Sequence, residues 1–248
     1  MMTEMRQKRV ALVTGASRGI GAAVATRLAR DGFAVMVNYA GNTALAEEVV
    51  RGIVWAGGTA EAVQGDVADP AAVRALFGQA EQRFGGVDVV VNAAGILMQA
   101  PLTESDDTLF DRQVAVNLKG TFNVLREAGN RVRTGGRIIT LSTSVVGLKL
   151  ETYGVYAATK AAVETLTAIL SKELRGRGIT VNAVAPGPTA TDLFLKGKSP
   201  ELIDRLAKLP PLERLGTPED IAAAVAFLSG PDGGWINGQT LRSNGGMV

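Results

Sequence analysis

The sequence contains no cysteine and no histidine. This excludes disulfide bonds, thiolate nucleophiles, iron–sulfur clusters, zinc sites made of Cys and His, and every acid–base device built on an imidazole. Proton transfer in this protein must therefore use Tyr, Lys, Asp, Glu or water. Aromatic residues are also few, at 5% of the chain, and only three of them are tyrosines.

The charge is not one-sided. With 26 basic and 24 acidic residues the net charge is +2, and Lys and Arg form no long blocks. The electrostatic signature of a nucleic-acid-binding protein is therefore missing. A looser group of arginines is either solvated surface charge or attracts an acidic partner. Its members are Arg126, Arg131, Arg133 and Arg137.

Long hydrophobic runs are absent too. No stretch approaches the ~18 uninterrupted apolar residues of a membrane helix. Residues 1–9 lack the apolar core of a signal peptide, so a cytoplasmic protein is expected. No linker, repeat or low-complexity stretch divides the chain. We expect one domain over residues 1–248, with residues 1–7 flexible.

The chain does contain short apolar runs that alternate with longer amphipathic segments. The runs at 10–13, 33–37, 60–63, 87–91, 137–141, 179–185 and 239–242 are predicted strands. The predicted helices cover 20–30, 44–55, 70–84, 108–131, 154–175, 200–208 and 218–228, and the fourth is expected to loosen near Gly120. This alternation predicts an α/β fold with a parallel sheet covered by helices on both faces.

A glycine-rich loop, residues 14–21, follows the first predicted strand and precedes a helix. Gly15 permits a sharp turn out of the strand, and Gly19 lets backbone amides approach a pyrophosphate at the helix N-terminus. Gly21 allows close packing of helix and strand. The loop predicts a dinucleotide site, and the alternative is a glycine-rich turn that binds nothing.

The end of the second strand indicates which dinucleotide is bound. NAD-binding sites place an acidic residue there for the ribose 2′-hydroxyl, but residues 37–42, which include Asn38 and Tyr39, contain none. Arg18, inside the glycine loop, offers a guanidinium suited to phosphate. We therefore predict NADP(H) in preference to NAD(H). The alternative is that Arg18 is a surface residue and Asn38 accepts either cofactor.

Tyr156 and Lys160 lie four residues apart, which places both side chains on one face of a helix. An ammonium group beside a phenol favours the phenolate, so the pKa of Tyr156 is expected to fall below its usual ~10. The pair is a candidate proton donor.

With these motifs, the chain resembles the classical short-chain dehydrogenases/reductases from about residue 8 to residue 246. The resemblance is carried in order by residues 14–21, by residues 92–95 (Asn-Ala-Ala-Gly), by a Ser/Tyr/Lys set, and by Pro186 and Gly187. In appearance the chain is closest to 3-oxoacyl-acyl-carrier-protein reductases. The resemblance implies a single-domain Rossmann-like, doubly wound sheet of about seven strands, a homotetramer, and hydride transfer between NAD(P)(H) and an alcohol or carbonyl.

The resemblance also implies a set of cofactor-binding residues and no metal. Asp66 and Val67 would lie at the adenine, and residues 92–95 would flank its ribose. Pro186, Gly187, Thr189 and Thr191 would hold the nicotinamide end. The whole set is Gly15, Ser17, Arg18, Gly19, Ile20, Gly21, Asn38, Tyr39, Asp66, Val67, Asn92, Ala93, Ala94, Gly95, Tyr156, Lys160, Pro186, Gly187, Thr189 and Thr191.

The same resemblance assigns catalytic roles. Tyr156 would act as general acid or base, and Lys160 would lower its pKa and bind the nicotinamide ribose. A serine should hydrogen-bond the substrate oxygen. The usual spacing of 13 residues before the tyrosine reaches Thr143, but Ser144 precedes Val-Val-Gly as in relatives. We select Ser144, with a one-residue deletion in 148–155, and Ser142 as the fallback.

Asn117 matches the fourth catalytic member of the family and would support a proton route behind the lysine. The alternative is a simple helix kink, since Asn is a poor mid-helix residue.

The leading functional hypothesis is an NADP(H)-dependent oxidoreductase that interconverts a carbonyl and a secondary alcohol. A 3-oxoacyl thioester on an acyl carrier is the most specific substrate considered, with contacts from 147–155 and 193–209. The alternative is a dinucleotide-sensing regulatory protein without catalysis. Oligomer contacts are expected from residues 108–131, 154–175 and 235–248.

Overall fold

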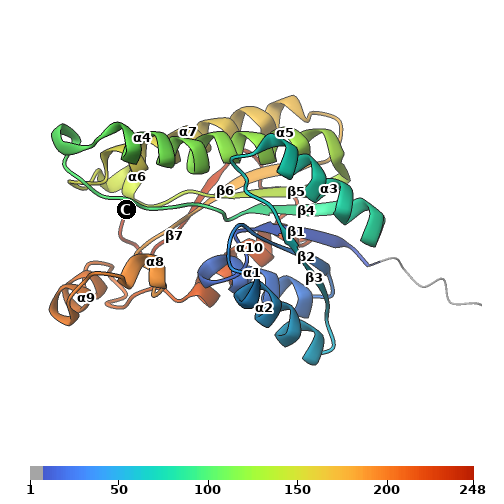
Figure 1. Ribbon diagram of the computed structural model, residues 1–248, viewed down its shortest axis with the longest axis horizontal. Coiled ribbons are helices and arrows are strands. Elements are labelled where there is room, and N and C mark those ends of the chain that lie inside the picture. The colour runs from blue at the N-terminus through green and yellow to red at the C-terminus, as the bar shows by residue number, and fades with distance from the viewer. Residues whose placement is uncertain (1–7) are drawn as a thin grey trace, which may run out of the picture.

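The computed structural model describes residues 8–248, so the expectation for residues 1–7 falls outside the described part. Seven parallel strands form one sheet in the order β3-β2-β1-β4-β5-β6-β7 (Figure 1). The strands are β1 (Val10–Thr14), β2 (Ala34–Tyr39), β3 (Thr59–Gln64), β4 (Val87–Asn92), β5 (Val132–Leu141), β6 (Thr180–Pro186) and β7 (Thr240–Ser243). The predicted Rossmann-like, doubly wound fold is confirmed.

Helices cover both faces of the sheet, as Figure 1 shows. On one face lie α1 (Gly19–Arg30), α2 (Thr43–Trp55) and α10 (Pro218–Ser229). On the other lie α3 (Pro70–Phe84), α4 (Asp107–Gln113), α5 (Gly120–Arg131) and α7 (Gly154–Glu173). The short α8 (Asp192–Leu195) and α9 (Pro200–Ala207) extend beyond the end of the sheet.

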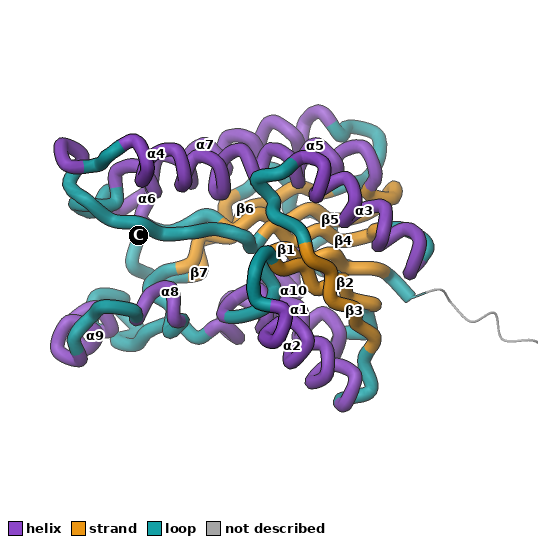
Figure 2. The backbone as a smooth tube through the Cα atoms, in the orientation of Figure 1, coloured by secondary structure: helices purple, strands orange, loops and turns teal. Residues whose placement is uncertain are grey.

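Alternating side chains of the strands build two separate cores, one on each face. In β1, Ala11 and Val13 pack toward α1 and α10, whereas Leu12 packs toward α3, α5 and α7. The inner strands are buried on both faces, which is why they read as continuous apolar runs. Figure 2 shows the sheet enclosed between these two helical layers.

The strand order changes direction between β1 and β4, and this point positions the functional site. From β1 the chain continues to β2 on one side, and later returns to place β4 on the other. In such sheets the crevice at the carboxyl ends of the two strands is the ligand site. Thr14 and Asn92, the last residues of β1 and β4, are joined there by a 2.9 Å hydrogen bond.

The structure adds elements that the sequence pattern did not predict. β5 begins at Val132, five residues before the expected start, because Gly135 adopts a positive φ of 80° and the pairing with β4 is bulged. Short helices are present at η1 (Leu102–Glu104), α6 (Val145–Leu148) and α8. The expected loosening before Gly120 is a π-helix, η2 (Val114–Lys119). Within residues 8–248, no helix is long and apolar enough to span a bilayer.

Candidate active site

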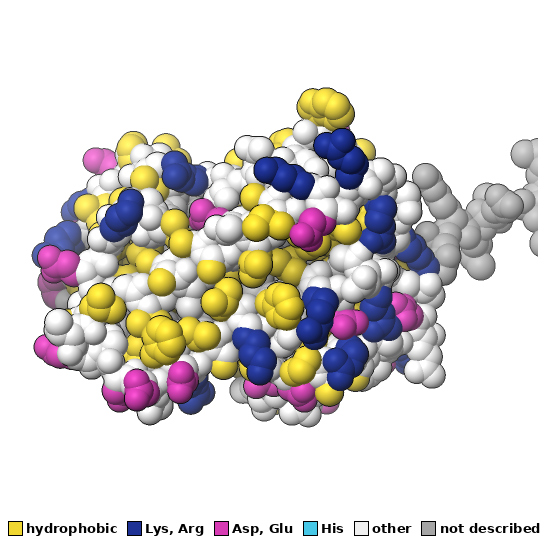
Figure 3. Space-filling view, turned by 90° about the horizontal axis from the view of Figure 1, so that it is seen from above, with side chains coloured by type: hydrophobic (Ala, Val, Ile, Leu, Met, Phe, Trp, Pro, Cys, Tyr) yellow, Lys and Arg dark blue, Asp and Glu magenta, His cyan; other side chains and the backbone are white. Residues whose placement is uncertain are grey.

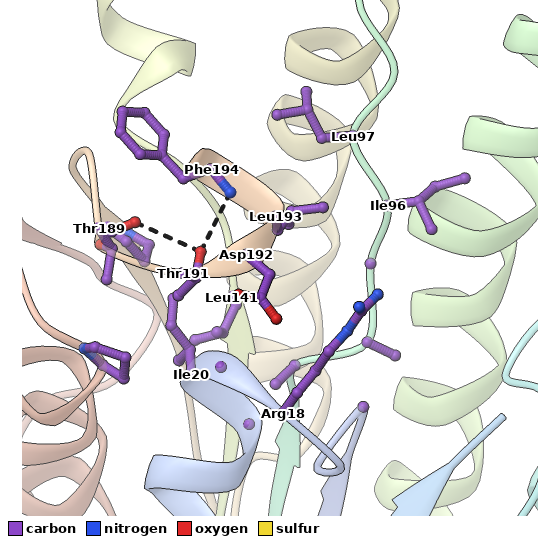
Figure 4. A pocket seen from close by; sticks show the side chains of 18 of the residues that line it. Arg18, Ile20, Ile96, Leu97, Leu141, Thr189, Thr191, Asp192, Leu193 and Phe194 are labelled. Atoms are coloured by element: carbon purple, nitrogen blue, oxygen red, sulfur yellow. Dashed lines mark hydrogen bonds between the residues drawn. The ribbon is translucent and has the colours of Figure 1, made fainter. Parts of the chain in front are cut away.

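A cavity of about 1110 Å³ opens at the carboxyl ends of the strands. Its floor is the glycine loop and the ends of β4 and β5, and its upper walls come from α6, α7 and the α8–α9 segment. Figure 4 shows Ile96 and Leu97 on one side, Thr191 and Phe194 on another, and Arg18 reaching from the start of α1 toward Ile96.

The glycine loop has the close approaches that the sequence predicted. Gly15 has φ +62°, and a Cβ on it would lie 2.7 Å from the Cα of Ala94. A Cβ on Gly21 would lie 2.3 Å from the Gly15 carbonyl oxygen. Bare backbone therefore lines the cavity where α1 begins, and the N–H groups of the first turn of this helix suit a pyrophosphate. The loop and a cavity of this volume fit a dinucleotide.

Asn38 holds this loop in place. Its backbone oxygen accepts a hydrogen bond from Ala16 N at 2.8 Å, and its side-chain Nδ2 donates to the Gly65 carbonyl at 3.0 Å. The side chain is 1% exposed, so its polar atoms serve the protein itself. Asn38 and the neighbouring Tyr39 line the cavity as parts of its wall.

Arg18 is an available cation at this end. It is exposed and lines the cavity, and its guanidinium forms no hydrogen bond or ion pair with any residue of the described chain. No carboxylate occurs in residues 38–42, which form the adjacent wall. This part of the cavity therefore suits an anionic group.

Tyr156 and Lys160 both line the cavity from α7, one turn apart. Lys160 is 5% exposed, and its Nζ donates to the Leu141 carbonyl at 2.7 Å and lies 5.9 Å from the centre of the Tyr156 ring. Burial lowers the pKa of Lys160 to about 8. The predicted face-sharing geometry is present.

The predicted direction of the tyrosine pKa is wrong for this structure. Burial raises the pKa of Tyr156 to about 12, and a hydrogen bond with Thr143 acts in the opposite direction. The reason is that Lys160 directs its ammonium to the Leu141 carbonyl, so removal of the phenol from water dominates. Tyr156 is therefore held in its protonated form.

The hydroxyl that interacts with Tyr156 is that of Thr143, one residue before the predicted Ser144, although Ser142, Thr143 and Ser144 all line the cavity. The Ser144 Oγ donates to the Ala185 carbonyl at 3.2 Å and accepts a hydrogen bond from Asn244 Nδ2 at 2.9 Å. The fallback, Ser142, donates to Glu164 Oε1 at 2.5 Å. Side chains alternate past the end of β5, so Thr143 alone of the three interacts with the phenol. The 13-residue spacing is kept without a deletion.

Asn117 lies in the π-helix and is fully buried. Its Oδ1 accepts from Ile96 N at 2.8 Å and its Nδ2 donates to the Ile96 carbonyl at 2.9 Å. A Cβ on Gly95 would lie 3.3 Å from Asn117 Oδ1 and 3.4 Å from Lys160 Nζ, so both groups converge on that glycine. Asn117 therefore fixes the loop after β4 next to the ammonium group of Lys160.

Most of the remaining predicted residues line the same cavity. They are Ser17, Gly19, Ile20, Asp66, Val67, Ala93, Ala94, Pro186, Gly187, Thr189 and Thr191. Asn92 does not line the cavity. It is 3% exposed, and its amide joins Thr14 of β1 to Thr121 of α5. The structure therefore makes Asn92 a scaffold residue behind the crevice.

Several cavity residues escaped the sequence reasoning. They include Ile96, Leu97, Arg112, Pro188 and Met247. Ile96 and Leu97 directly follow the Asn-Ala-Ala-Gly motif, and that position was an available signal. Met247 arrives from the far end of the chain, and no local pattern predicts its position.

The arginine cluster lies at the opposite end of the sheet. Arg131 ends α5 and Arg133 begins β5, whereas the cavity lies where β5 ends. Arg131 pairs with Glu81 at 2.5 Å and Arg133 with Asp88 at 3.3 Å. The hydrogen bond with Glu81 raises the pKa of Arg131. These arginines serve structural pairs away from the cavity.

The chain matches a family of known proteins over nearly its full length. The family model described as enoyl-(acyl carrier protein) reductase matches residues 15–248. A short-chain type dehydrogenase/reductase from Picea abies is 46% identical over 97% of this chain and 92% of its own length. The NADPH-dependent aldehyde reductase-like protein of Arabidopsis thaliana is 44% identical, over 97% and 94%. A 3-oxoacyl-[acyl-carrier-protein] reductase of Staphylococcus aureus is 42% identical, over 98% and 99%.

Solved structures agree with this match. A dehydrogenase/reductase from Sinorhizobium meliloti superposes with a TM-score of 0.92 at 39% identity, covering 96% of this chain and 94% of its own. A short-chain dehydrogenase from Burkholderia cenocepacia in complex with NADP gives a TM-score of 0.91 at 38% identity, covering 98% and 99%.

Proposed function

The chain belongs to the short-chain dehydrogenase/reductase family of oxidoreductases, and we propose that it reduces a carbonyl to an alcohol, with Tyr156 as the proton donor. The observation that carries this proposal is the position of one phenol. Tyr156 lies in the cavity beside the Thr143 hydroxyl and one helical turn from Lys160, at the carboxyl edge of a sheet that carries a dinucleotide loop.

NADP(H) is the proposed cofactor. The Burkholderia neighbour binds NADP and the Arabidopsis relative is NADPH-dependent. In this chain, Arg18 supplies an exposed guanidinium beside a wall without carboxylates, and both features favour a ribose 2′-phosphate. The backbone at Gly19 would approach the pyrophosphate, with Gly15 and Gly21 giving the loop its shape. Pro186, Gly187, Thr189 and Thr191 would hold the nicotinamide end.

The proposed reaction adds a hydride to the carbonyl carbon and a proton to the carbonyl oxygen. The reduced cofactor, when bound, supplies a hydride to the carbonyl carbon. Tyr156 donates its phenolic proton to the carbonyl oxygen, and Thr143 stabilises the negative charge that develops there through its hydroxyl. Because the pKa of Tyr156 is about 12, the phenol remains protonated at neutral pH, which is the form that reduction requires.

Lys160 and Asn117 assist this proton transfer, the first through its charge and the second by holding the neighbouring main chain. At neutral pH Lys160 is mainly charged, since its pKa is about 8, and its ammonium stabilises the phenolate left after proton transfer. Asn117 holds the Ile96 main chain and converges with Lys160 on Gly95. We infer that this arrangement keeps the lysine within reach of the phenol.

The substrate end of the cavity is mainly apolar. Its lining includes Leu148, Leu150, Leu193, Phe194 and Leu206, from the two stretches that the sequence predicted. A substrate with a hydrophobic body next to its carbonyl fits this lining. The Staphylococcus relative supports a 3-oxoacyl thioester, and the Arabidopsis relative supports an aldehyde. The arginine cluster gives the acyl-carrier hypothesis no support, because it lies at the far end of the sheet.

The test is NADPH consumption with a panel of aldehydes and ketones by the wild-type chain and three variants. Tyr156→Phe should reduce kcat by about 10³-fold or more while the Kd for NADPH stays the same, because only the transferable proton is removed. Thr143→Ala should lose about 10²-fold in kcat, whereas Ser144→Ala should lose much less. Normal turnover by Tyr156→Phe would overturn the proposed mechanism.

A further inference from the structure

The segment that follows β7, residues 244–248, folds back over the active-site loop. Asn244 is 9% exposed, and its side chain makes four hydrogen bonds. Its Nδ2 donates to Ser144 Oγ at 2.9 Å and to the Val248 carbonyl at 3.2 Å. Its Oδ1 accepts from the backbone N–H groups of Gly246 at 3.0 Å and Met247 at 3.2 Å. One buried amide thus closes the turn and fastens it to the loop after β5.

Close packing holds the segment at both ends. A Cβ on Gly147, in α6, would lie 2.8 Å from Val248 Cγ2. A Cβ on Gly245 would lie 3.0 Å from Pro210 Cβ, in the stretch that follows α9. Gly245 and Gly246 both adopt positive φ, at 67° and 88°, which makes this tight return possible. The segment therefore bridges α6 and the end of the α8–α9 region, and Figure 1 shows the chain end beside α6.

The turn places Met247 in the wall of the cavity. The residue is partly buried and lines the same cavity as Leu148, Leu150 and Phe194. A methionine side chain is unbranched and polarisable, so it adapts to apolar groups of different shape. The polar atoms of the Asn244 side chain are all paired within the protein, so the contribution of Met247 to the cavity is apolar surface.

We propose that residues 244–248 form a wall of the substrate site, with Met247 as a specificity-determining residue and Asn244 as the residue that positions it. The ligand is the hydrophobic body of the carbonyl substrate, beyond the reacting carbon. This inference rests on the proposed carbonyl reduction and goes beyond it by naming the wall that selects substrate size.

Substitution of Met247 tests the wall directly. The probes are straight-chain aldehydes from propanal to decanal, with NADPH, and the readout is kcat/KM for each. Met247→Ala should lower kcat/KM for decanal by about tenfold and affect kcat/KM for propanal much less, because contacts with the distal methylene groups are lost. Met247→Trp should also lower kcat/KM for decanal relative to propanal, because the larger side chain fills the part of the cavity that the long chain would occupy. Met98→Ala is the matched control, since Met98 does not line the cavity, and should change neither.

Asn244→Ala tests the positioning role through a readout that loss of stability alone does not move. It should raise KM for decanal about tenfold with kcat for propanal unchanged. The Kd for NADPH, measured by fluorescence, should also remain the same. Hydrogen exchange should accelerate at residues 245–248 and 147–148 and stay constant in the central strands.

The outcomes separate the two proposals. If the wild-type chain consumes no NADPH with any carbonyl, the proposed function fails, and the inference fails with it. The other case is that the wild type is active while both Met247 variants keep the wild-type ratio of kcat/KM for decanal to kcat/KM for propanal. In that case the inference alone is overturned. The melting temperature of each variant identifies any loss caused by unfolding.

Discussion

At the residue scale, the central feature is a buried pair of titratable groups. Burial raises the pKa of Tyr156 to about 12 and lowers that of Lys160 to about 8, so both shifts favour the neutral forms. The same burial that keeps the phenol protonated for reduction makes the lysine charge costly. Removal of water, rather than attraction between the two groups, sets both pKa values in this structure.

The lysine shift predicts a specific pH dependence of stability. A lysine in the unfolded chain has a pKa near 10.4, so between about pH 8 and 10.4 the unfolded state binds more protons than the folded state. The free energy of unfolding should therefore rise with pH in this window, by roughly 2 kcal/mol from pH 7.5 to 9.5.

Urea denaturation of the wild type and of Lys160→Met across this range checks the effect. The difference between the two proteins isolates Lys160, because every other group is shared. The rise should be absent from the variant. Parallel pH profiles for both proteins would show that Lys160 titrates normally in the fold.

Arg18 gives a second prediction at this scale. Arg18→Ala should weaken NADPH binding by about tenfold or more and leave NADH binding almost unchanged, because the guanidinium is proposed to contact only the 2′-phosphate. Fluorescence titration with both cofactors measures this. An equal loss for NADPH and NADH would assign Arg18 to the shared pyrophosphate instead.

Tyr156, Lys160 and the glycine loop could be recognised in the sequence because each is marked by a short local pattern. The first two are one helical turn apart, and the glycines lie at a junction of strand and helix. The sequence favoured Ser144 over Thr143, because the local context before Val-Val-Gly was given more weight than the spacing of 13 residues to Tyr156. Only the path of the chain past β5 shows that the Ser144 hydroxyl is committed to Ala185 and Asn244.

At the element scale, the junction of β1 and α1 determines whether the site exists. The substitution Gly21→Ala tests this, because the added Cβ would lie 2.3 Å from the Gly15 carbonyl oxygen. The helix or the loop must shift, at a cost of about 1–3 kcal/mol in unfolding free energy, together with a large loss of NADPH affinity. Chemical denaturation and cofactor titration measure the two effects.

Gly52→Ala is the control for this experiment. Gly52 lies inside α2, and a Cβ on it meets nothing within 4 Å. Alanine should stabilise the protein there by about 0.5–1 kcal/mol and leave the cofactor affinity unaltered. If both variants behaved alike, the close approach at Gly21 would not be a constraint.

Elements that are marked by a local sequence pattern were predicted well. The seven strands and seven longer helices follow from apolar runs and helical periodicity, and Asp69 with Pro70 marks the start of α3. The short α6 and α8 were missed, since four-residue helices depend on tertiary packing. The early start of β5 was missed because its glycines resemble a turn.

At the scale of the whole molecule, exposed hydrophobic side chains gather over α4, α5 and α7, along the face seen in Figure 3. Phe110, Phe122 and Ile169 are each about half exposed there, at 51%, 46% and 48%. On a separate face, near α10 and β7, Trp235 is 99% exposed. Exposed apolar surface of this kind marks interfaces. It coincides with the segments expected to form a homotetramer.

We therefore predict that the chain self-associates, and that Phe110→Lys combined with Ile169→Lys lowers the mass measured by light scattering. Trp235→Lys should disrupt the second face. Trp55→Lys is the control, because Trp55 is 91% exposed at the end of α2, outside those segments. A wild type that is monomeric at micromolar concentration would contradict this prediction.

The most direct measurement of the central claim is the fate of the transferred hydride. The wild-type chain would be supplied with an aldehyde or ketone that it consumes and with NADPH deuterated at the transferred position of the nicotinamide. The product would then be examined by mass spectrometry and NMR. The account predicts one deuterium on the carbinol carbon of each alcohol formed, with the hydroxyl proton drawn from solvent through Tyr156. Cofactor that binds but is never oxidised by any carbonyl, or an alcohol without deuterium at that carbon, would contradict it.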